Sequence, residues 1–135
     1  MKTHIYKTRV RYAETDQMGV VYYGNYLIYL ESARTGLLRE EGYSYADMEK
    51  AGLFLPVIEC KINYKGSAHY DEEITVETTI GFIRNASIEF RYVIRNPSGK
   101  AIIFAHTVHP LVDKDWKIKS IPDDIRALLA PFVES

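Results

Sequence analysis

A short segment of the chain, residues 14–25, contains the side chains whose types and spacing could do chemistry. It carries the carboxylate Asp16 and runs into a periodic apolar stretch, which predicts a helix that begins near Tyr23 to Asn25. A carboxylate beside a carbonyl group can attack it directly, or it can orient and deprotonate a water. The free N–H groups and positive dipole end of a helix can stabilise the negative charge that develops on the carbonyl oxygen. The segment therefore has the parts needed for attack on a carbonyl compound.

Each part of this segment also has an ordinary structural explanation. A loop aspartate such as Asp16 more often caps a turn or a helix than takes part in a reaction. Gly19 and Gly24 would allow the backbone to approach a ligand closely, but ordinary turn geometry explains them equally well. The residues alone leave both interpretations open.

The residues after this segment predict the helix that would hold it. Between residues 25 and 41, apolar side chains recur at spacings of three and four, and Gly42 supplies a C-terminal stop. Leu27, Ile28 and Leu38 broaden the apolar surface, which favours a helix contacted on most sides and wrapped by a sheet. A weak capping box that begins at Ser44 predicts one or two further helical turns over residues 45–50.

Most of the remaining chain alternates apolar and polar residues, as strands with one buried face do. Strands are expected over residues 5–12, 58–65, 74–82, 88–95, 101–112 and 116–119, and a short helix after Pro122. This order predicts an α+β fold with a helix packed against an antiparallel sheet. Because no linker or repeat divides the chain, residues 1–135 are expected to form a single domain. Long sheet edges need pairing or covering, which favours association of two copies.

Composition limits the possible partners and cofactors. The chain has 17 Lys and Arg against 18 Asp and Glu, so no broad attraction to nucleic acid or to an anionic membrane is implied. No apolar run approaches the roughly 20 residues that span a bilayer, and the N-terminal residues are too polar for a signal peptide. A cytoplasmic location is therefore expected. The single cysteine, Cys60, excludes an intramolecular disulfide and a cysteine-rich zinc site, and it follows the apolar face of its strand as a core residue.

A known family has a motif similar to this segment. Residues 12–26, YAETDQMGVVYYGNY, followed by YLESAR at residues 29–34, resemble the signature of the 4-hydroxybenzoyl-CoA thioesterase family and its short-chain and long-chain acyl-CoA thioesterase relatives. Residues 64–72 resemble the family's strand turn that ends in an acidic residue, and residues 121–122 resemble its C-terminal entry. The resemblance thus covers nearly the whole chain. It implies the hotdog fold, in which a curved antiparallel sheet wraps around a long central helix.

The resemblance implies hydrolysis of an acyl-CoA to a carboxylic acid and free coenzyme A, with no metal or cofactor beyond the coenzyme A of the substrate. In the family the aspartate at the position of Asp16 is catalytic, and the backbone N–H at the position of Tyr23 polarises the thioester carbonyl. Whether Asp16 acts as nucleophile or as general base stays open. A homodimer or homotetramer is also implied.

The resemblance further implies a set of substrate-binding residues, which are Tyr12, Gly24, Lys65, Arg84, Asn85 and Ser87. Arg84, Asn85 and Ser87 resemble the nucleotide-contacting region of the family, where arginine and lysine suit the phosphates of coenzyme A. A solvated hairpin would explain the same three residues, and Tyr12 has an equally ordinary role in packing.

Two other carboxylates compete with Asp16. Glu14 is interpreted as a solvated loop residue, and Glu31 as the partner of Arg34 at a helical spacing of three. Some other hotdog thioesterases use a carboxylate on the helix, so Glu31 is the second catalytic candidate. The chain departs from one bacterial subgroup at Tyr23, where that subgroup has a histidine thought to assist hydrolysis. A tyrosine with a pKa near 10 cannot replace it as a base.

Several other kinds of site are disfavoured. His106 and His109 are three residues apart on an expected strand, so their side chains point to opposite faces and make a poor metal pair. The chain has no G-x-S-x-G motif, which argues against a serine nucleophile. Two alternatives to a thioesterase remain, which are a hotdog-fold acyl-thioester hydratase or dehydratase and a non-catalytic acyl-CoA-binding module. No histidine lies in residues 12–41, which disfavours the first.

Overall fold

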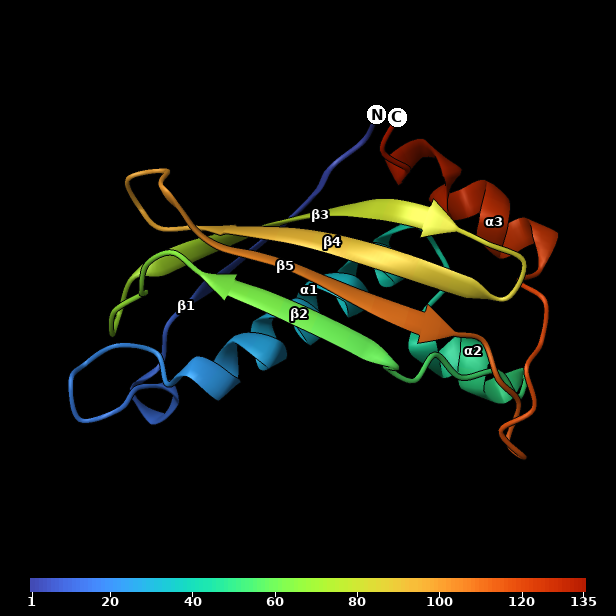
Figure 1. Ribbon diagram of the computed structural model, residues 1–135, viewed down its shortest axis with the longest axis horizontal. Helices are drawn as coiled ribbons and strands as arrows, with labels where there is room; N and C mark the ends of the chain where they lie inside the picture. Colours follow the sequence, from blue (N-terminus) through green and yellow to red (C-terminus); the bar gives the residue numbers. More distant parts are fainter.

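The computed structural model describes residues 1–135, and its main feature is one antiparallel sheet with a long helix across one face (Figure 1). The five strands are hydrogen-bonded in the order β1-β3-β4-β5-β2. They are β1 (His4–Arg9), β2 (Glu59–Tyr64), β3 (Glu73–Ile83), β4 (Ser87–Arg95) and β5 (Ala101–Pro110). The helices are α1 (Tyr26–Glu40), α2 (Tyr45–Lys50) and α3 (Asp123–Leu129), with short 3₁₀ turns at Tyr12–Glu14, Tyr23–Asn25 and Ala130–Phe132.

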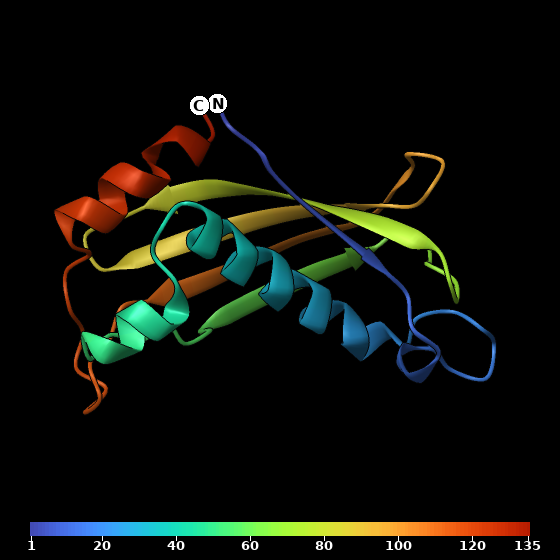
Figure 2. The same ribbon diagram turned by 180° about the vertical axis from the view of Figure 1, so that it is seen from behind.

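The long helix α1 forms because its apolar residues repeat at helical spacing and share one buried face. Tyr29, Leu30, Ala33 and Leu37 are buried against the sheet, and Figure 2 shows α1 lying along its inner face. The helix ends within one residue of the predicted boundary, where Gly42 takes a φ of 94°. The capping box at Ser44 is also present and starts α2.

The opposite face of α1 is uncovered in the single chain. Leu27 and Ile28, near the start of the helix, are 46% and 47% exposed. The sequence predicts a helix contacted on most sides, whereas this chain alone covers only the side that faces the sheet. The apolar residues at this position are therefore available for contact with another molecule.

The sheet contributes the other half of the core through alternation along its central strands. In β3, Ile74, Val76, Thr78 and Ile80 are fully buried, while the residues between them are not. Burial of one such Ile or Val side chain contributes roughly 1.5–3 kcal/mol. This alternation fixes which face of β3 meets α1.

The predicted end of the first strand is wrong, and the last predicted strand is absent. The first strand ends at Arg9, because the carboxylate of Glu14 accepts the Arg11 N–H and the chain turns into a 3₁₀ helix at Tyr12. The strand expected over residues 116–119 does not form, and only an isolated bridge joins Val112 to Ile118.

A tight turn replaces that last strand. The Asp113 carboxylate accepts the N–H groups of Asp115 and Lys117, and Trp116 takes a φ of 62°, which no strand residue adopts.

Strand β2 lies at one edge of the sheet and is exposed along most of its length. Cys60, which the sequence predicts to be a core residue, is exposed for this reason. Alternation along β2 is real, but an edge strand paired only with β5 has no layer covering its apolar face. The thiol of Cys60 is still partly covered by its neighbours. This partial burial raises the pKa of the thiol and disfavours the reactive thiolate.

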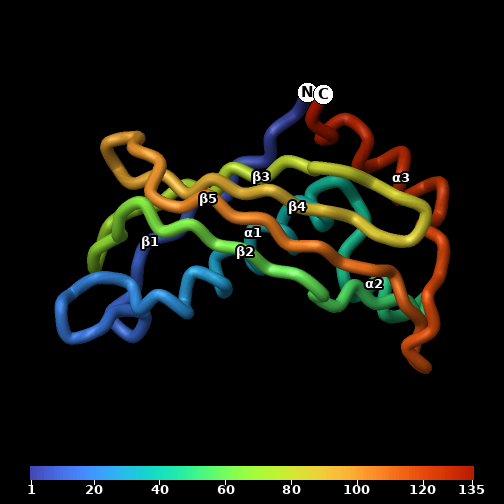
Figure 3. The backbone as a smooth tube through the Cα atoms, viewed as in Figure 1, coloured from blue at the N-terminus to red at the C-terminus, as the bar shows by residue number.

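The two ends of the chain lie side by side, as Figure 3 shows. The Lys2 N–H donates to the Pro131 carbonyl at 2.7 Å, and the Glu134 N–H donates to the Ile80 carbonyl at 2.8 Å. The C-terminal residues are therefore held on the sheet near β3. The chain contains no helix with the length and apolar character needed to cross a bilayer.

Candidate active site

The segment before α1 folds into a small, hydrogen-bonded hairpin. The Asp16 N–H donates to the Val20 carbonyl at 2.9 Å, and the Tyr22 N–H donates to the Glu14 carbonyl at 3.0 Å. Gly19 closes the tip with a φ of 77°, a conformation that favours glycine. Gly19 therefore has the turn conformation that was one of the two explanations for a glycine at this position.

The Asp16 side chain lies at this tip and is exposed. Its Oδ1 accepts the Met18 N–H at 2.8 Å, which makes an Asx turn. Its other carboxylate oxygen makes no hydrogen bond within the chain, so it is available to a substrate carbonyl or a water. The capping interpretation and the catalytic interpretation use different oxygens of one carboxylate.

Glu14 is buried and anchors the base of the hairpin. Its carboxylate accepts hydrogen bonds from the Arg11 N–H at 2.8 Å, the Arg11 guanidinium and the Tyr29 hydroxyl at 2.9 Å. Burial alone would raise the pKa of Glu14, but these donors outweigh it and lower the pKa. The interpretation of Glu14 as a solvated residue is therefore wrong. Its partner Tyr29 is 15 residues away on α1, so this contact depends on the fold and not on the local sequence.

The N–H groups that precede α1 supply the second half of the site. Tyr23 and Gly24 open a 3₁₀ turn that continues into the helix, and the Asn25 side chain ties this turn to the Glu14 carbonyl at 2.9 Å. None of the turn and loop hydrogen bonds of the chain has the Tyr23 or Gly24 N–H as its donor. The first N–H groups of a helical turn have no partner inside it, so these two donors are available to an oxyanion.

Aromatic side chains surround the hairpin. The Tyr23 ring packs against Tyr22 with ring centres 4.7 Å apart, and against Tyr64 of β2 at 6.3 Å. The Tyr64 hydroxyl donates to the Tyr23 carbonyl at 3.2 Å, which places Lys65, the next residue, at the same end of the sheet. Tyr12 is exposed on the other side.

Three tyrosines of this group, Tyr22, Tyr64 and Tyr70, were not predicted to belong to the site. Tyr70 packs against Tyr12 with ring centres 5.6 Å apart, and Tyr64 is brought to the helix start by strand pairing. In a chain with 11 tyrosines, residue type alone carries no signal of such a group.

The remaining predicted substrate-binding residues lie elsewhere. Arg84, Asn85 and Ser87 are at the turn between β3 and β4, at the opposite end of the sheet from the hairpin (Figure 1). Strand β3 has 11 residues, which is about 33 Å of extended chain. Within one chain the structure does not bring these residues together with Asp16.

The turn itself is held by the C-terminal part of the chain. The Ile121 N–H donates to the Asn85 carbonyl at 2.8 Å, and Arg126 donates to the Arg84 carbonyl at 3.0 Å. The Arg84 guanidinium lies over the Phe82 ring. The turn is thus a structured corner with an exposed cation rather than a loose hairpin.

The second carboxylate candidate is not paired as predicted. Arg34 donates to the hydroxyls of Tyr45 and Tyr92, and it forms no ion pair with Glu31, because its side chain turns inward under the sheet. Glu31 is exposed on α1, away from the hairpin tip.

The two histidines of β5 face opposite sides of the sheet, as predicted. His109 is fully buried, and His106 pairs with Glu59 on the outer side. No three His, Cys, Asp or Glu side chains form a group that could hold a metal ion.

A curved antiparallel sheet over one long helix is the arrangement of the hotdog fold, and an exposed carboxylate and unbonded helix-start N–H groups lie at one end of it. Comparisons with known proteins agree. The family model described as the thioesterase-like superfamily matches residues 10–129. The protein of Bacillus subtilis named "Putative acyl-CoA thioesterase YneP" is 45% identical over 106 residues, which are 78% of this chain and 77% of that protein.

Solved structures share the same fold. The DHNA-CoA thioesterase of Staphylococcus aureus is 34% identical, with a TM-score of 0.88 and coverage of 97% of this chain and 91% of that one. A 4-hydroxybenzoyl CoA thioesterase is only 21% identical but has a TM-score of 0.87, over 96% of this chain and 99% of the other, and it shows the fold. The chain belongs to the thioesterase-like superfamily, and the predicted hotdog fold and α+β class are confirmed.

Proposed function

We propose that this protein hydrolyses an acyl-CoA thioester to a carboxylic acid and free coenzyme A, with Asp16 as the reacting carboxylate. The observation that carries the proposal is the free oxygen of Asp16 on the same hairpin that leads to the unbonded N–H groups of Tyr23 and Gly24. The thioester carbonyl oxygen accepts from those N–H groups, which stabilise its negative charge in the transition state. Membership of the thioesterase-like superfamily supports the same reaction class.

Two routes use the same atoms. In the first, a carboxylate oxygen of Asp16 attacks the thioester carbon, the C–S bond breaks, coenzyme A leaves as a thiolate that takes up a proton, and water then cleaves the acyl-aspartyl anhydride. In the second, Asp16 removes a proton from a water as that water attacks the carbon, the C–S bond then breaks, and the proton passes from Asp16 to the departing coenzyme A thiolate. Both routes end with the carboxylate regenerated and one water consumed. Neither route draws on a metal or a redox cofactor.

The substitution Asp16→Asn tests the role of the carboxylate. An amide oxygen at this position can still accept the Met18 N–H, so the Asx turn is kept while the negative charge is removed. We expect kcat for thiol release to fall at least about 100-fold, because a general base usually contributes a factor of about 100 or more. The measurement is thiol release from a panel of aliphatic and aromatic acyl-CoAs. The aromatic members are included because the S. aureus relative is named for an aromatic acyl-CoA and because tyrosines surround the hairpin.

A matched control is Asp115→Asn, since Asp115 is another exposed turn aspartate, in the turn after β5. It should leave the rate unchanged. Equal turnover by wild type and Asp16→Asn would remove Asp16 from the mechanism. Tight binding of acyl-CoAs without hydrolysis by the wild type would instead favour a binding module.

We also propose that the protein acts as a homo-oligomer whose copies meet at β2. This edge strand has a free hydrogen-bonding side, and Ile58, the residue before the strand, is 66% exposed. The exposed apolar residues Leu27 and Ile28 of α1 form a second uncovered apolar surface. Association would also allow Arg84 of another copy to serve the site, since one chain places Arg84 at the opposite end of the sheet from Asp16.

A further inference from the structure

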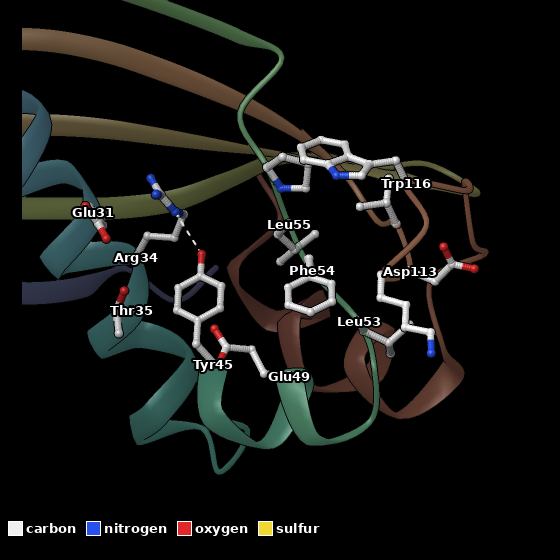
Figure 4. A pocket seen from close by; sticks show the side chains of 13 residues that line it. Glu31, Arg34, Thr35, Tyr45, Glu49, Leu53, Phe54, Leu55, Asp113 and Trp116 are labelled. Carbon is white, nitrogen blue, oxygen red and sulfur yellow. Dashed lines mark hydrogen bonds between the residues drawn. The ribbon is translucent and has the colours of Figure 1, made fainter.

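A cavity of about 700 Å³ lies between α1, α2, residues 53–56 and the turn after β5 (Figure 4). Its wall is largely apolar and includes Phe54, Leu55 and Trp116. The cavity is separate from the Asp16 hairpin, because Arg34 in its lining is eight residues beyond the start of α1, or about 12 Å along the helix. The volume is in the range of small-molecule sites.

Arg34 is the buried charged residue in the wall of this cavity. It is 8% exposed, and its guanidinium is charged at any physiological pH. Its Nε donates to the Tyr45 hydroxyl at 3.0 Å, the contact drawn in Figure 4, and its Nη1 donates to the Tyr92 hydroxyl at 3.1 Å. Its Nη2 donates to no group of the chain, and no carboxylate forms an ion pair with it. A buried cation with only neutral partners is unusual, because removal of a charge from water is costly unless an anion compensates.

The neutral partners hold the guanidinium in one orientation. The Tyr92 hydroxyl is also bonded to Thr107 at 2.7 Å, and Thr107 is bonded to His109 at 2.8 Å, so the chain of hydroxyls continues into the core. A fixed, partly unsatisfied guanidinium is suited to bind a planar carboxylate.

The acidic side chains around the cavity do not neutralise Arg34. The Asp113 carboxylate is occupied by the N–H groups of its own turn and by Lys119 at 3.6 Å. Glu31 and Glu49 are exposed, so water screens them, as it screens Lys114 on the same rim. The interior of the cavity therefore presents one cation and an apolar wall.

We propose that this cavity binds a small organic carboxylate with an apolar body, the carboxylate against Arg34 and the body against Leu55 and Trp116. The acid released by the proposed hydrolysis belongs to this chemical class, so the cavity is suited to hold a product or a similar acid away from Asp16. Binding of an acid requires no turnover. The site can therefore be tested in a protein that cannot hydrolyse thioesters.

Trp116 is the only tryptophan of the chain and lines the cavity, so its fluorescence reports on the site directly. The experiment titrates benzoate, octanoate and the neutral analogue benzamide into the Asp16→Asn protein. We expect a saturable change in Trp116 emission with the acids and an affinity for benzamide at least about tenfold weaker, because a hydrogen-bonded charge pair contributes a factor of ten or more.

Two variants remove the site in different ways. Arg34→Met removes the cation and should weaken acid binding at least about tenfold. Thr35→Phe fills the cavity from the surface of α1 and should abolish the emission change without a change in charge. Thr35→Phe keeps the test valid if Arg34→Met fails to fold, which circular dichroism would reveal. The control Lys114→Gln removes the rim cation and should change the affinity by less than about twofold.

Four results would overturn the inference. They are the absence of binding at millimolar acid, equal binding of acid and amide, unchanged binding in Thr35→Phe, and binding to the wild type that is lost in Asp16→Asn. The last result would place the acid at the hairpin. Failure of the proposed function is a separate result, since a wild type that binds acids but releases no thiol keeps this inference and loses the hydrolysis.

Discussion

Glu14 and Asp16 are two residues apart and have opposite environments. Glu14 accepts hydrogen bonds from Arg11 and Tyr29 and is buried, whereas Asp16 is exposed and keeps one oxygen free. A buried carboxylate with all its oxygens occupied stabilises the hairpin, and an exposed one with a free oxygen can react. The chemical difference between these carboxylates comes from their surroundings rather than from residue type.

His109 provides a residue-scale prediction about pH. Burial, together with the nearby Arg34 charge, lowers the pKa of His109 from 6.5 to about 4. Between pH 6.5 and about 4, His109 binds a proton in the unfolded chain but not in the folded chain. The free energy of unfolding therefore falls as pH drops from 6.5 to about 4. The loss from this residue is at most about 3 kcal/mol. Denaturant unfolding of wild type and His109→Gln across this range measures it, and the variant should show the smaller dependence on pH.

The matched control is His69→Gln, because His69 is exposed and lies beside Glu72 on the loop before β3. It should follow the wild-type dependence closely. If wild type and His109→Gln lose stability in parallel from pH 6.5 to 4, the buried imidazole is not the cause.

Among the elements, β3 contains an irregularity that holds the C-terminus. The pairing of β3 with β4 shifts register between Ile80 and Phe82, and Gly81 stands at the shift. A Cβ at Gly81 would collide with the carboxylate of Glu89, which pairs with Arg91. Arg91 also forms an ion pair with Glu134. The absence of a Cβ at Gly81 therefore leaves room for the ion pairs that attach the C-terminal residues to the sheet.

Two glycine substitutions are expected to have opposite effects. Gly81→Ala should destabilise the protein by about 1–3 kcal/mol through overpacking. Gly36→Ala, inside α1, should stabilise it by about 0.5–1 kcal/mol, because its Cβ would only touch the His4 ring at 3.5 Å and alanine favours the helix. Urea midpoints of the two variants test this, and a shift of both in the same direction would contradict it.

Local patterns predicted the elements well where side chains decide them locally. The range of α1, the capping box at Ser44 and the stop at Gly42 follow from neighbours within a few residues. The predictions failed where a distant group decides. Cys60 is exposed because its strand is at an edge, and the order of strands in a sheet cannot be read from alternation.

At the scale of the whole molecule, the proposed association through β2 can be tested by size-exclusion chromatography with light scattering. Wild type is expected to elute as a dimer or tetramer, and Ile58→Glu as smaller species, because it places a charge on the shared apolar surface. Ile5→Glu is the control, since Ile5 is exposed on β1 at the opposite edge of the sheet. A monomeric wild type would remove the proposal, as would equal dissociation of both variants.

The candidate site was only partly within reach of the sequence. Asp16, Tyr23 and Gly24 are close in the chain, so one motif describes them, and the structure places them on one hairpin and the helix turn that follows. Tyr64 reaches Tyr23 through strand pairing, which a single sequence does not reveal. The cavity at Arg34 depends on packing between separate elements and has no local signature at all.

The pairing of Lys2 with Pro131 has a practical consequence for the order of the elements along the chain. Because residues 2 and 131 lie side by side, a short linker could join the two ends of the described chain, and new ends could be opened in the exposed turn at residues 96–99 between β4 and β5. Such a circularly permuted chain would keep every strand pair of the sheet. It would also move both ends to the turn between β4 and β5, where another domain could be attached.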